Sequence, residues 1–292
     1  MRNILLLTLL SWTCLAQQQV ILKDLAAFQH PSTNWTIEGA VQAAYSDTSL
    51  QVATGQGVLV NTLRNGKYKR LDDLTFAFSH GDIHLMFDFM LPKNGNSGVY
   101  LQGRYEVQLA DSWTKKQLKY GDCGGIYERW DDARGKGKEG FEGYAPMQNA
   151  SKAPGLWQSM EIDFQAPRFD INGKKIQNAL FKKVVLNGIL IHENIEVLGV
   201  TRGAVSSQEV ASAPILIQGD HTQVAFKNIQ YETYDKPSVS LGPIKYDYYT
   251  GKFTEPIIGT AKPVESGKLD KLTYKVIKAK NDYLIHYQAD LD

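Results

Sequence analysis

Short segments in which apolar and polar residues alternate dominate this chain. Residues 83–89 and 157–164 carry apolar side chains at every second position. A period of two places successive side chains on opposite faces of a β-strand. Gly, Asn, Asp and Pro separate the segments, and helical periodicity is nearly absent. The pattern predicts an all-β sandwich of two face-packed antiparallel sheets.

Two turn sequences predict how neighbouring strands connect. Residues 182–191 are expected to form a hairpin closed by Asn187-Gly188, because an Asn-Gly pair readily adopts the two positive φ angles of a tight turn. Residues 214–218 and 224–231 are expected to form a further pair, joined at residues 219–222.

Residues 99–111 are the most informative segment. Read as one alternating strand, it has an apolar face formed by Val99, Leu101, Tyr105, Val107 and Leu109. Its other face carries Gln102, Arg104, Glu106 and Gln108, and Tyr100, Asp111 and Trp113 flank this row. Amide, guanidinium and carboxylate groups suit polyhydroxylated ligands, although an ordinary solvated face would also alternate. We interpret the row as the floor of a sugar-binding groove.

A long irregular segment follows this strand. Residues 115–153 are rich in Gly and charge and show little β pattern. Loops of this length within a compact domain are usually functional or disordered. The segment is expected to form a lid or wall over the groove, with a plain surface loop as the alternative.

Composition divides the chain into three parts. Residues 1–16 are interpreted as a secretory signal peptide, because Arg2 precedes an apolar run, 4–10, that is too short to span a bilayer. Residues 17–235 form the main domain, and 236–292 are expected to be a linker plus β extension, either packed on that domain or beginning a second one. The sequence predicts an exported, periplasmic or extracellular protein; a lipoprotein anchored at Cys14 is the alternative.

Charge, cysteine and histidine usage exclude several classes of function. The formal net charge is +1 with no basic stripe, which argues against nucleic-acid binding. Without the signal only Cys123 is left, so no internal disulfide is expected, and a buried structural thiol is favoured over a nucleophile. Asp82 and His84 could ligate an ion, but a solvated pair is favoured, and the sequence predicts no cofactor. No segment beyond the signal approaches transmembrane length.

Two groups of residues could carry chemistry. Arg104 and Glu106 lie two apart on the proposed polar face, as a structural ion pair or as a positioned carboxylate beside a cation. Gln218-Gly-Asp-His221 follows another predicted strand, and His221 there is either a turn hydrogen-bonder or a catalytic group.

The motif in residues 96–111 resembles the NSG…YEVQ…D core of the 3-keto-disaccharide hydrolase family. Later blocks of that family resemble, in the same order, residues 124–127, 155–158, 185–188, 214–221 and 226–229. The resemblance extends over residues 20–234. It implies a concanavalin-like jelly roll with the long loop over its concave face, and action on glycosides oxidised at C3 of the sugar. The chain departs from the pattern in its longer 115–153 loop and at Thr222-Gln223, where a second Gly is commoner.

The chemistry that this resemblance implies is elimination. A ketone at C3 acidifies the proton on C2, a general base removes it, and donors hold the enolate while the C1 group departs. Water can then add to the enone, which gives net hydrolysis. We assign catalytic roles to Glu106, His221 and Arg104, with Glu106 or His221 as base or acid. Substrate-binding roles are assigned to Gln102, Gln108, Asp111, Trp113, Tyr127, Gln218 and Asp220.

Two other functions compete with this one. The first is a non-catalytic carbohydrate-binding module of a larger surface protein. The second is a laminarinase-like glycosidase, which would place several carboxylates on one strand, whereas here the strand offers only Glu106. All three functions imply an oligosaccharide or glycoside as the partner.

Overall fold

The computed structural model describes residues 17–62, 69, 72–234, 244–251, 261–269 and 282–288. The chain divides into two compact units between Tyr234 and Asp235. The expected signal peptide, 1–16, lies outside the described residues. No described helix is long and apolar enough to cross a membrane.

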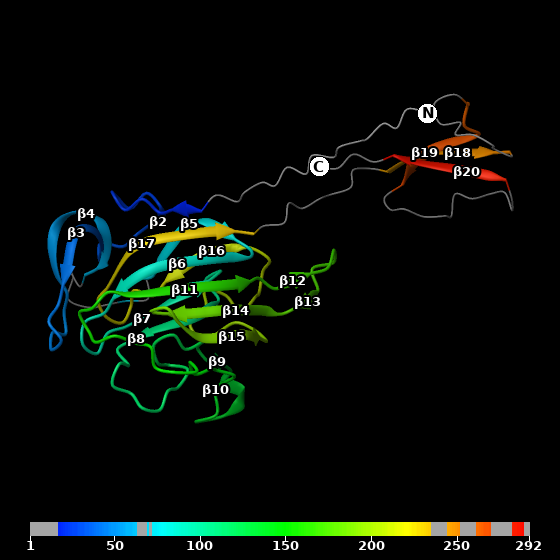
Figure 1. The fold of residues 1–292 in the computed structure, drawn as a ribbon. Coiled ribbons are helices and arrows are strands. Elements are labelled where there is room, and N and C mark those ends of the chain that lie inside the picture. Colours follow the sequence, from blue (N-terminus) through cyan, green and yellow to red (C-terminus); the bar gives the residue numbers. More distant parts are fainter. Residues whose placement is uncertain are drawn as a thin grey trace, which may run out of the picture. The chain divides into compact units, whose positions relative to one another are not determined.

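The larger unit contains an extended antiparallel sheet. Figure 1 shows β17, β6, β11, β14 and β15 side by side in that order. The full order is β15 (Ile189–Val197), β14 (Ala179–Leu186), β11 (Gln158–Gln165), β6 (Ile83–Met90), β17 (Val224–Thr233), β4 (Gln51–Asn61) and β3 (Trp35–Gln42), with β1 (Gln18–Gln19) also paired to β17.

A smaller sheet packs against it. Its order is β2 (Phe28–Gln29), β5 (Leu74–His80), β16 (Ala213–Ile217), β7 (Asn96–Leu101) and β8 (Tyr105–Ala110). The remaining short elements are β9 (Arg129–Trp130) with β10 (Gly140–Phe141), β12 (Arg168–Phe169) with β13 (Lys175–Gln177), and the 3₁₀ turn η2 (Asp132–Arg134).

The hydrophobic core lies between these two sheets and confirms the predicted β-sandwich. Phe87 and Phe164 of the larger sheet belong to the same buried cluster as Val107 and Ile217 of the smaller one. The predicted alternation is present: in β6 every odd position from Ile83 to Phe89 is buried. Each strand therefore presents one apolar face to the other sheet, and this burial is the main stabilising force of the fold.

The hairpin at Asn187-Gly188 is confirmed. It joins β14 to β15, and the two residues have φ angles of 54° and 80°. Two positive φ angles in succession match the right-handed twist of the strands that they connect.

The prediction of one continuous strand over residues 99–111 is wrong. The segment is a hairpin of β7 and β8, turned at Gln102 and Gly103 with φ angles of 54° and 63°. The Arg104 amide donates to the Leu101 carbonyl and closes the turn. The period of two continues on both sides of the turn, so the apolar residues still all reach the core.

The predicted pairing of 214–218 with 224–231 is also wrong. β16 pairs with β5 and β7 in the smaller sheet, whereas β17 pairs with β4 and β6 in the larger one. The turn between them therefore crosses from one sheet to the other.

The smaller unit contains a three-stranded antiparallel sheet in the order β19 (Glu265–Leu269), β18 (Ile244–Thr250) and β20 (Tyr283–Gln288). Tyr248 and Tyr249 of its central strand are buried.

Candidate functional site

A polar cavity of about 270 Å³ opens on the outer face of the smaller sheet. Six of the sequence-predicted site residues line it: Glu106, Gln108, Tyr127, Gln218, Asp220 and His221. Asn96, Tyr100, Arg202 and Gly203 complete the lining. The side chains on β8 alternate between this cavity and the core, because Val107 and Leu109 point inward.

The hairpin register places Glu106 on the cavity floor. Tyr100 lies opposite Glu106 in the neighbouring strand, and Gly98 lies opposite Gln108. The Glu106 side chain passes over Gly98 so closely that a Cβ there would be 2.2 Å from its Oε1. Glycine at position 98 is therefore required for the observed position of the carboxyl group.

Glu106 is a buried acid with an unsatisfied oxygen. Its side chain is 1% exposed, and its Oε2 has no hydrogen-bond partner among the described residues. Burial raises the pKa of the carboxyl group to about 8; its hydrogen bond with the Tyr100 hydroxyl opposes the rise, and the charges of Asp220 and Asp73 add to it. An acid that titrates near neutral pH suits proton transfer, and such shifts are typical of catalytic groups.

Two segments cover the free edge of β8 and meet at Glu106. The Tyr127 amide donates to the Glu106 carbonyl at 3.1 Å, and the Glu106 amide donates to Thr201 Oγ1 at 3.1 Å. The first segment, 124–127, belongs to the long loop, which therefore forms a wall of the cavity. The second, 199–205, contributes Arg202 and Gly203.

The turn that crosses between the sheets forms the opposite wall. The Gly219 amide donates to Asp73 Oδ1, and its carbonyl accepts from Asn61 Nδ2. Asp220 then bonds to His221 Nδ1. This pair is partly exposed, whereas the neighbouring Gln218 Oε1 is buried without a partner among the described residues.

Four sequence-predicted residues do not line the cavity. Arg104 lies beside the turn at Gln102 and Gly103, where its Nε donates to the Gln208 carbonyl. It was expected beside Glu106 on the polar face, but it does not line the cavity. Gln102 is buried and donates to the carbonyls of His80 and Ala211. Both corrections follow from the turn at Gln102, which breaks the polar row of the expected strand.

The last two of these residues stabilise the surface near the end of β8. Asp111 Oδ2 accepts a hydrogen bond from the Asn94 amide. Trp113 is 40% exposed and packs edge-on against Tyr45, with 5.8 Å between ring centroids.

Arg202 lines the cavity but was not predicted from the sequence. It lies outside any strand, and hydrogen bonds of the preceding residue, Thr201, to Arg104 and Glu106 help to bring it to the cavity. Asn96 and Tyr100 could have been predicted, because both lie in the motif of residues 96–111. In the structure, Gln108 Nε2 donates to Asn96 Oδ1.

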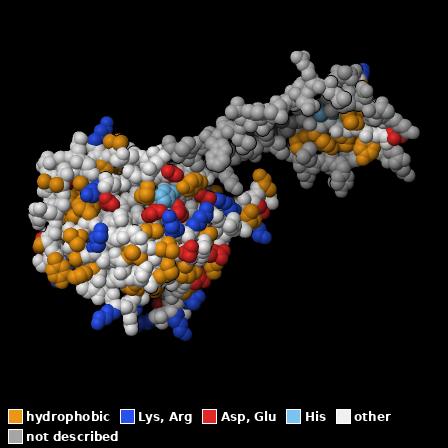
Figure 2. Space-filling view, in the orientation of Figure 1, with side chains coloured by type: hydrophobic (Ala, Val, Ile, Leu, Met, Phe, Trp, Pro, Cys, Tyr) orange, Lys and Arg blue, Asp and Glu red, His pale blue; other side chains and the backbone are white. Residues whose placement is uncertain are grey.

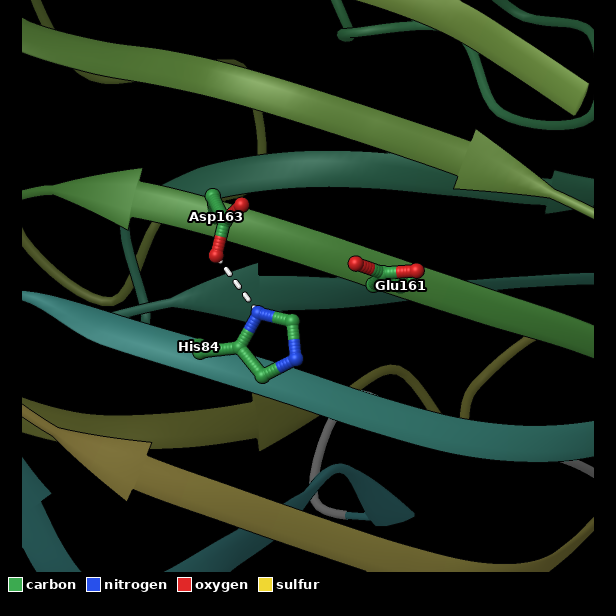
Figure 3. A group of neighbouring side chains, drawn as sticks. All are labelled: His84, Glu161 and Asp163. Atoms are coloured by element: carbon green, nitrogen blue, oxygen red, sulfur yellow. Dashed lines mark hydrogen bonds and ion pairs between the residues drawn. The ribbon is translucent and has the colours of Figure 1, made fainter. Parts of the chain in front are cut away.

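A separate group on the larger sheet has the composition of a metal site. His84 of β6 and Glu161 and Asp163 of β11 point toward one another in Figure 3, with ligand atoms within 4.8 Å. Lys183 already pairs with Glu161 at 2.5 Å and with Asp163 at 3.5 Å. Asp82 and His84 are not the solvated pair that the sequence favoured, because Asp82 is buried and binds Arg168 while His84 bonds to Asp163.

The remaining expectations concern Cys123 and the surface charge. Cys123 is buried and unpaired, and burial raises the pKa of its thiol to about 11, as expected for a structural residue. Figure 2 shows Lys and Arg side chains interspersed with Asp and Glu on the visible face of the larger unit.

The chain resembles a solved structure of another protein in fold. A candidate glycosyl hydrolase from Parabacteroides distasonis has a similar structure, with a TM-score of 0.51 and 22% sequence identity over 74% of this chain and 83% of that one. A second candidate glycosyl hydrolase from the same organism is 17% identical, with a TM-score of 0.49 over 75% of this chain and 99% of that one. Among curated proteins, none matches the chain.

The family assignment comes from the sequence of the larger unit as a whole. The profile of the 3-keto-alpha-glucoside-1,2-lyase-like domain matches residues 23–232. This range includes the smaller sheet, the larger sheet except for β1 and the last residue of β17, and every residue that lines the polar cavity. The chain therefore belongs to the family of 3-keto-alpha-glucoside-1,2-lyase-like domains and is a carbohydrate-active protein.

Proposed function

We propose that the protein cleaves glycosides whose sugar is oxidised at C3, by abstraction of the C2 proton and elimination of the C1 group. The observation that supports this best is Glu106, a buried carboxyl group at the floor of a polar cavity with Oε2 unsatisfied and its pKa raised to about 8. A base of this strength can accept the C2 proton, which the neighbouring ketone acidifies.

Glu106 is the general base in this proposal. The C–H electron pair of C2 moves into a C2–C3 double bond while the carbonyl oxygen at C3 becomes an enolate. When the carbonyl re-forms, a C1–C2 double bond appears and the C1–O bond breaks. The leaving oxygen takes that electron pair and needs a proton, which His221, coupled to Asp220 at the cavity wall, is placed to supply.

The amide side chains in the cavity bind sugar hydroxyls. The Gln218 Oε1 atom is a buried acceptor that a hydroxyl would satisfy. Gln108 is oriented by its bond to Asn96. Tyr127 supplies a ring and a hydroxyl at the wall. Mixed donors and acceptors of this kind match a polyhydroxylated ring.

The test compares oxidised and unoxidised substrates. The purified protein is incubated with 4-nitrophenyl 3-keto-glucosides of both anomers and with the parent glucosides, and enone and 4-nitrophenol are measured. Release of 4-nitrophenol from a 3-keto substrate alone is the expected result. Glu106→Gln should lose this activity, whereas Glu193→Gln, an exposed change on β15, should retain it.

Retention of full turnover in both Glu106→Gln and His221→Ala would show that the roles are misassigned. Saturable binding of the 3-keto-glucoside without product would instead favour a carbohydrate-binding module.

Export is part of the proposal: mass spectrometry of the native protein should find a mature form that begins near Gln17.

A further inference from the structure

Arg202 brings to the cavity the positive charge that was expected from Arg104. It is the one Lys or Arg among the described residues that line the cavity. A fixed cation is what a developing enolate oxygen requires, because a charged donor in a site partly shielded from water stabilises an anion more strongly than a neutral one.

Hydrogen bonds hold the backbone of Arg202 next to the cavity. Its amide donates to the Glu128 carbonyl at 2.7 Å, and its carbonyl accepts from the Tyr100 hydroxyl at 3.2 Å. The preceding residue, Thr201, is buried and accepts a hydrogen bond from the Glu106 amide. Arg202 is therefore held by bonds to the same hairpin that carries the general base.

The side chain of Arg202 is oriented but not saturated. Its guanidinium lies 3.7 Å from the centre of the Trp130 ring, and Nη1 is 3.5 Å from Glu128 Oε1. A guanidinium has five N–H donors; the Trp130 ring covers one face of its plane, and the contact with Glu128 leaves most of those in-plane donors available. The side chain is 48% exposed, so a ligand in the cavity can reach it.

We propose that Arg202 is a catalytic residue whose guanidinium donates to the C3 carbonyl oxygen of the oxidised sugar. Trp130 and Glu128 are its positioning residues. As Glu106 takes the C2 proton, the electron pair released from C2 forms the C2–C3 double bond and the carbonyl electrons move to oxygen. The guanidinium pairs with that oxygen until the carbonyl re-forms and the C1 group leaves. This role rests on the proposed elimination.

The experiment measures kcat and KM for a 4-nitrophenyl 3-keto-glucoside with Arg202→Gln and Arg202→Lys. Loss of one oxyanion donor lowers kcat by about 100-fold or more, and lysine, which retains the charge without the planar fork, should restore part of it. Arg134→Gln is the matched control. Arg134 also stacks on an aromatic ring, that of Phe141 at 4.2 Å within the 115–153 loop, but it does not line the cavity. It should leave both constants unchanged.

The outcomes separate this role from the proposed function. If Glu106→Gln abolishes turnover while Arg202→Gln keeps a normal kcat, or raises only KM, the catalytic role of Arg202 is wrong and the elimination stands. If the unaltered protein does not turn over 3-keto-glucosides, both proposals fail. Circular dichroism verifies folding, and if Arg202→Gln does not fold, the kcat of Arg202→Lys decides: a value equal to that of the unaltered protein overturns the role.

Discussion

Replacing Glu106 with Gln should stabilise the protein while it removes activity, and the gain should grow with pH. The pKa of Glu106 is raised from 4.5 to about 8, chiefly by burial. Between these two values the folded state holds a proton that the unfolded chain has already lost. Stability that is fully present below pH 4.5 is therefore lost as pH rises toward 8. Glutamine has the same shape and does not ionise, so the variant escapes this loss.

The magnitude follows from the two pKa values. Each pH unit across the interval changes the free energy of unfolding by about 1.4 kcal/mol. Integrated between pH 5 and pH 8, the loss through Glu106 is roughly 3 to 4 kcal/mol. Because the side chain is 1% exposed, solvent screening reduces this value little.

Urea unfolding of both proteins at pH 5 and pH 8 measures the effect. The difference in unfolding free energy between Glu106→Gln and the unaltered protein should increase by about 3 kcal/mol from the lower to the higher pH. Other titrating groups are common to both proteins and cancel. Glu193→Gln, at an exposed position, should show no such increase. An equal difference at the two pH values would refute the view that Glu106 is a buried acid with a raised pKa.

Three other predictions follow from the site and the core. For a 4-nitrophenyl 3-keto-glucoside, whose leaving group departs without a proton from His221, kcat/KM should rise with pH to a plateau with a midpoint near 8, because the general base Glu106 must be unprotonated; a profile that falls over this range would contradict that role. Burial lowers the pKa of His80 and His192 to about 4, so the unfolded chain binds protons between pH 6.5 and 4 that the folded state does not. Stability should fall as pH decreases through this interval, by up to about 3 kcal/mol per histidine, and His192→Asn should show a weaker decrease in urea unfolding than the unaltered protein. Gly98→Ala places a Cβ 2.2 Å from Glu106 Oε1, so it should displace the carboxyl group and lower kcat at least tenfold. A structure of Gly98→Ala with Glu106 unmoved would show that the contact is not restrictive.

The fold class was predictable because a period of two in apolar residues indicates a β-strand without knowledge of its neighbours. Each of β6 and β11 could be read from its own residues, since burying one face of a strand requires apolar side chains at alternate positions. Asn187-Gly188 was equally readable, because its turn chemistry is local. The turn at Gln102-Gly103 was not, since Gln is an uncommon residue at positive φ and the alternation continues through it.

The composition of the candidate site was partly predictable for the same reason. Glu106 and Gln108 lie on the outer face of a strand whose inner face is unmistakably apolar. Arg104 was misplaced because one undetected turn removed it from that face.

The alternation of side chains along the chain, together with the ordered motifs, determined a β-sandwich with a polar outer face that carries Glu106. The tertiary structure alone decided which distant segments meet there. Arg202 reaches the cavity with the help of the hydrogen bonds of Thr201 to Arg104 and Glu106, and His221 reaches it because its turn crosses between the sheets. Neither event leaves a local pattern, because both depend on contacts between residues about a hundred positions apart, whereas periodicity records only the surroundings of one strand.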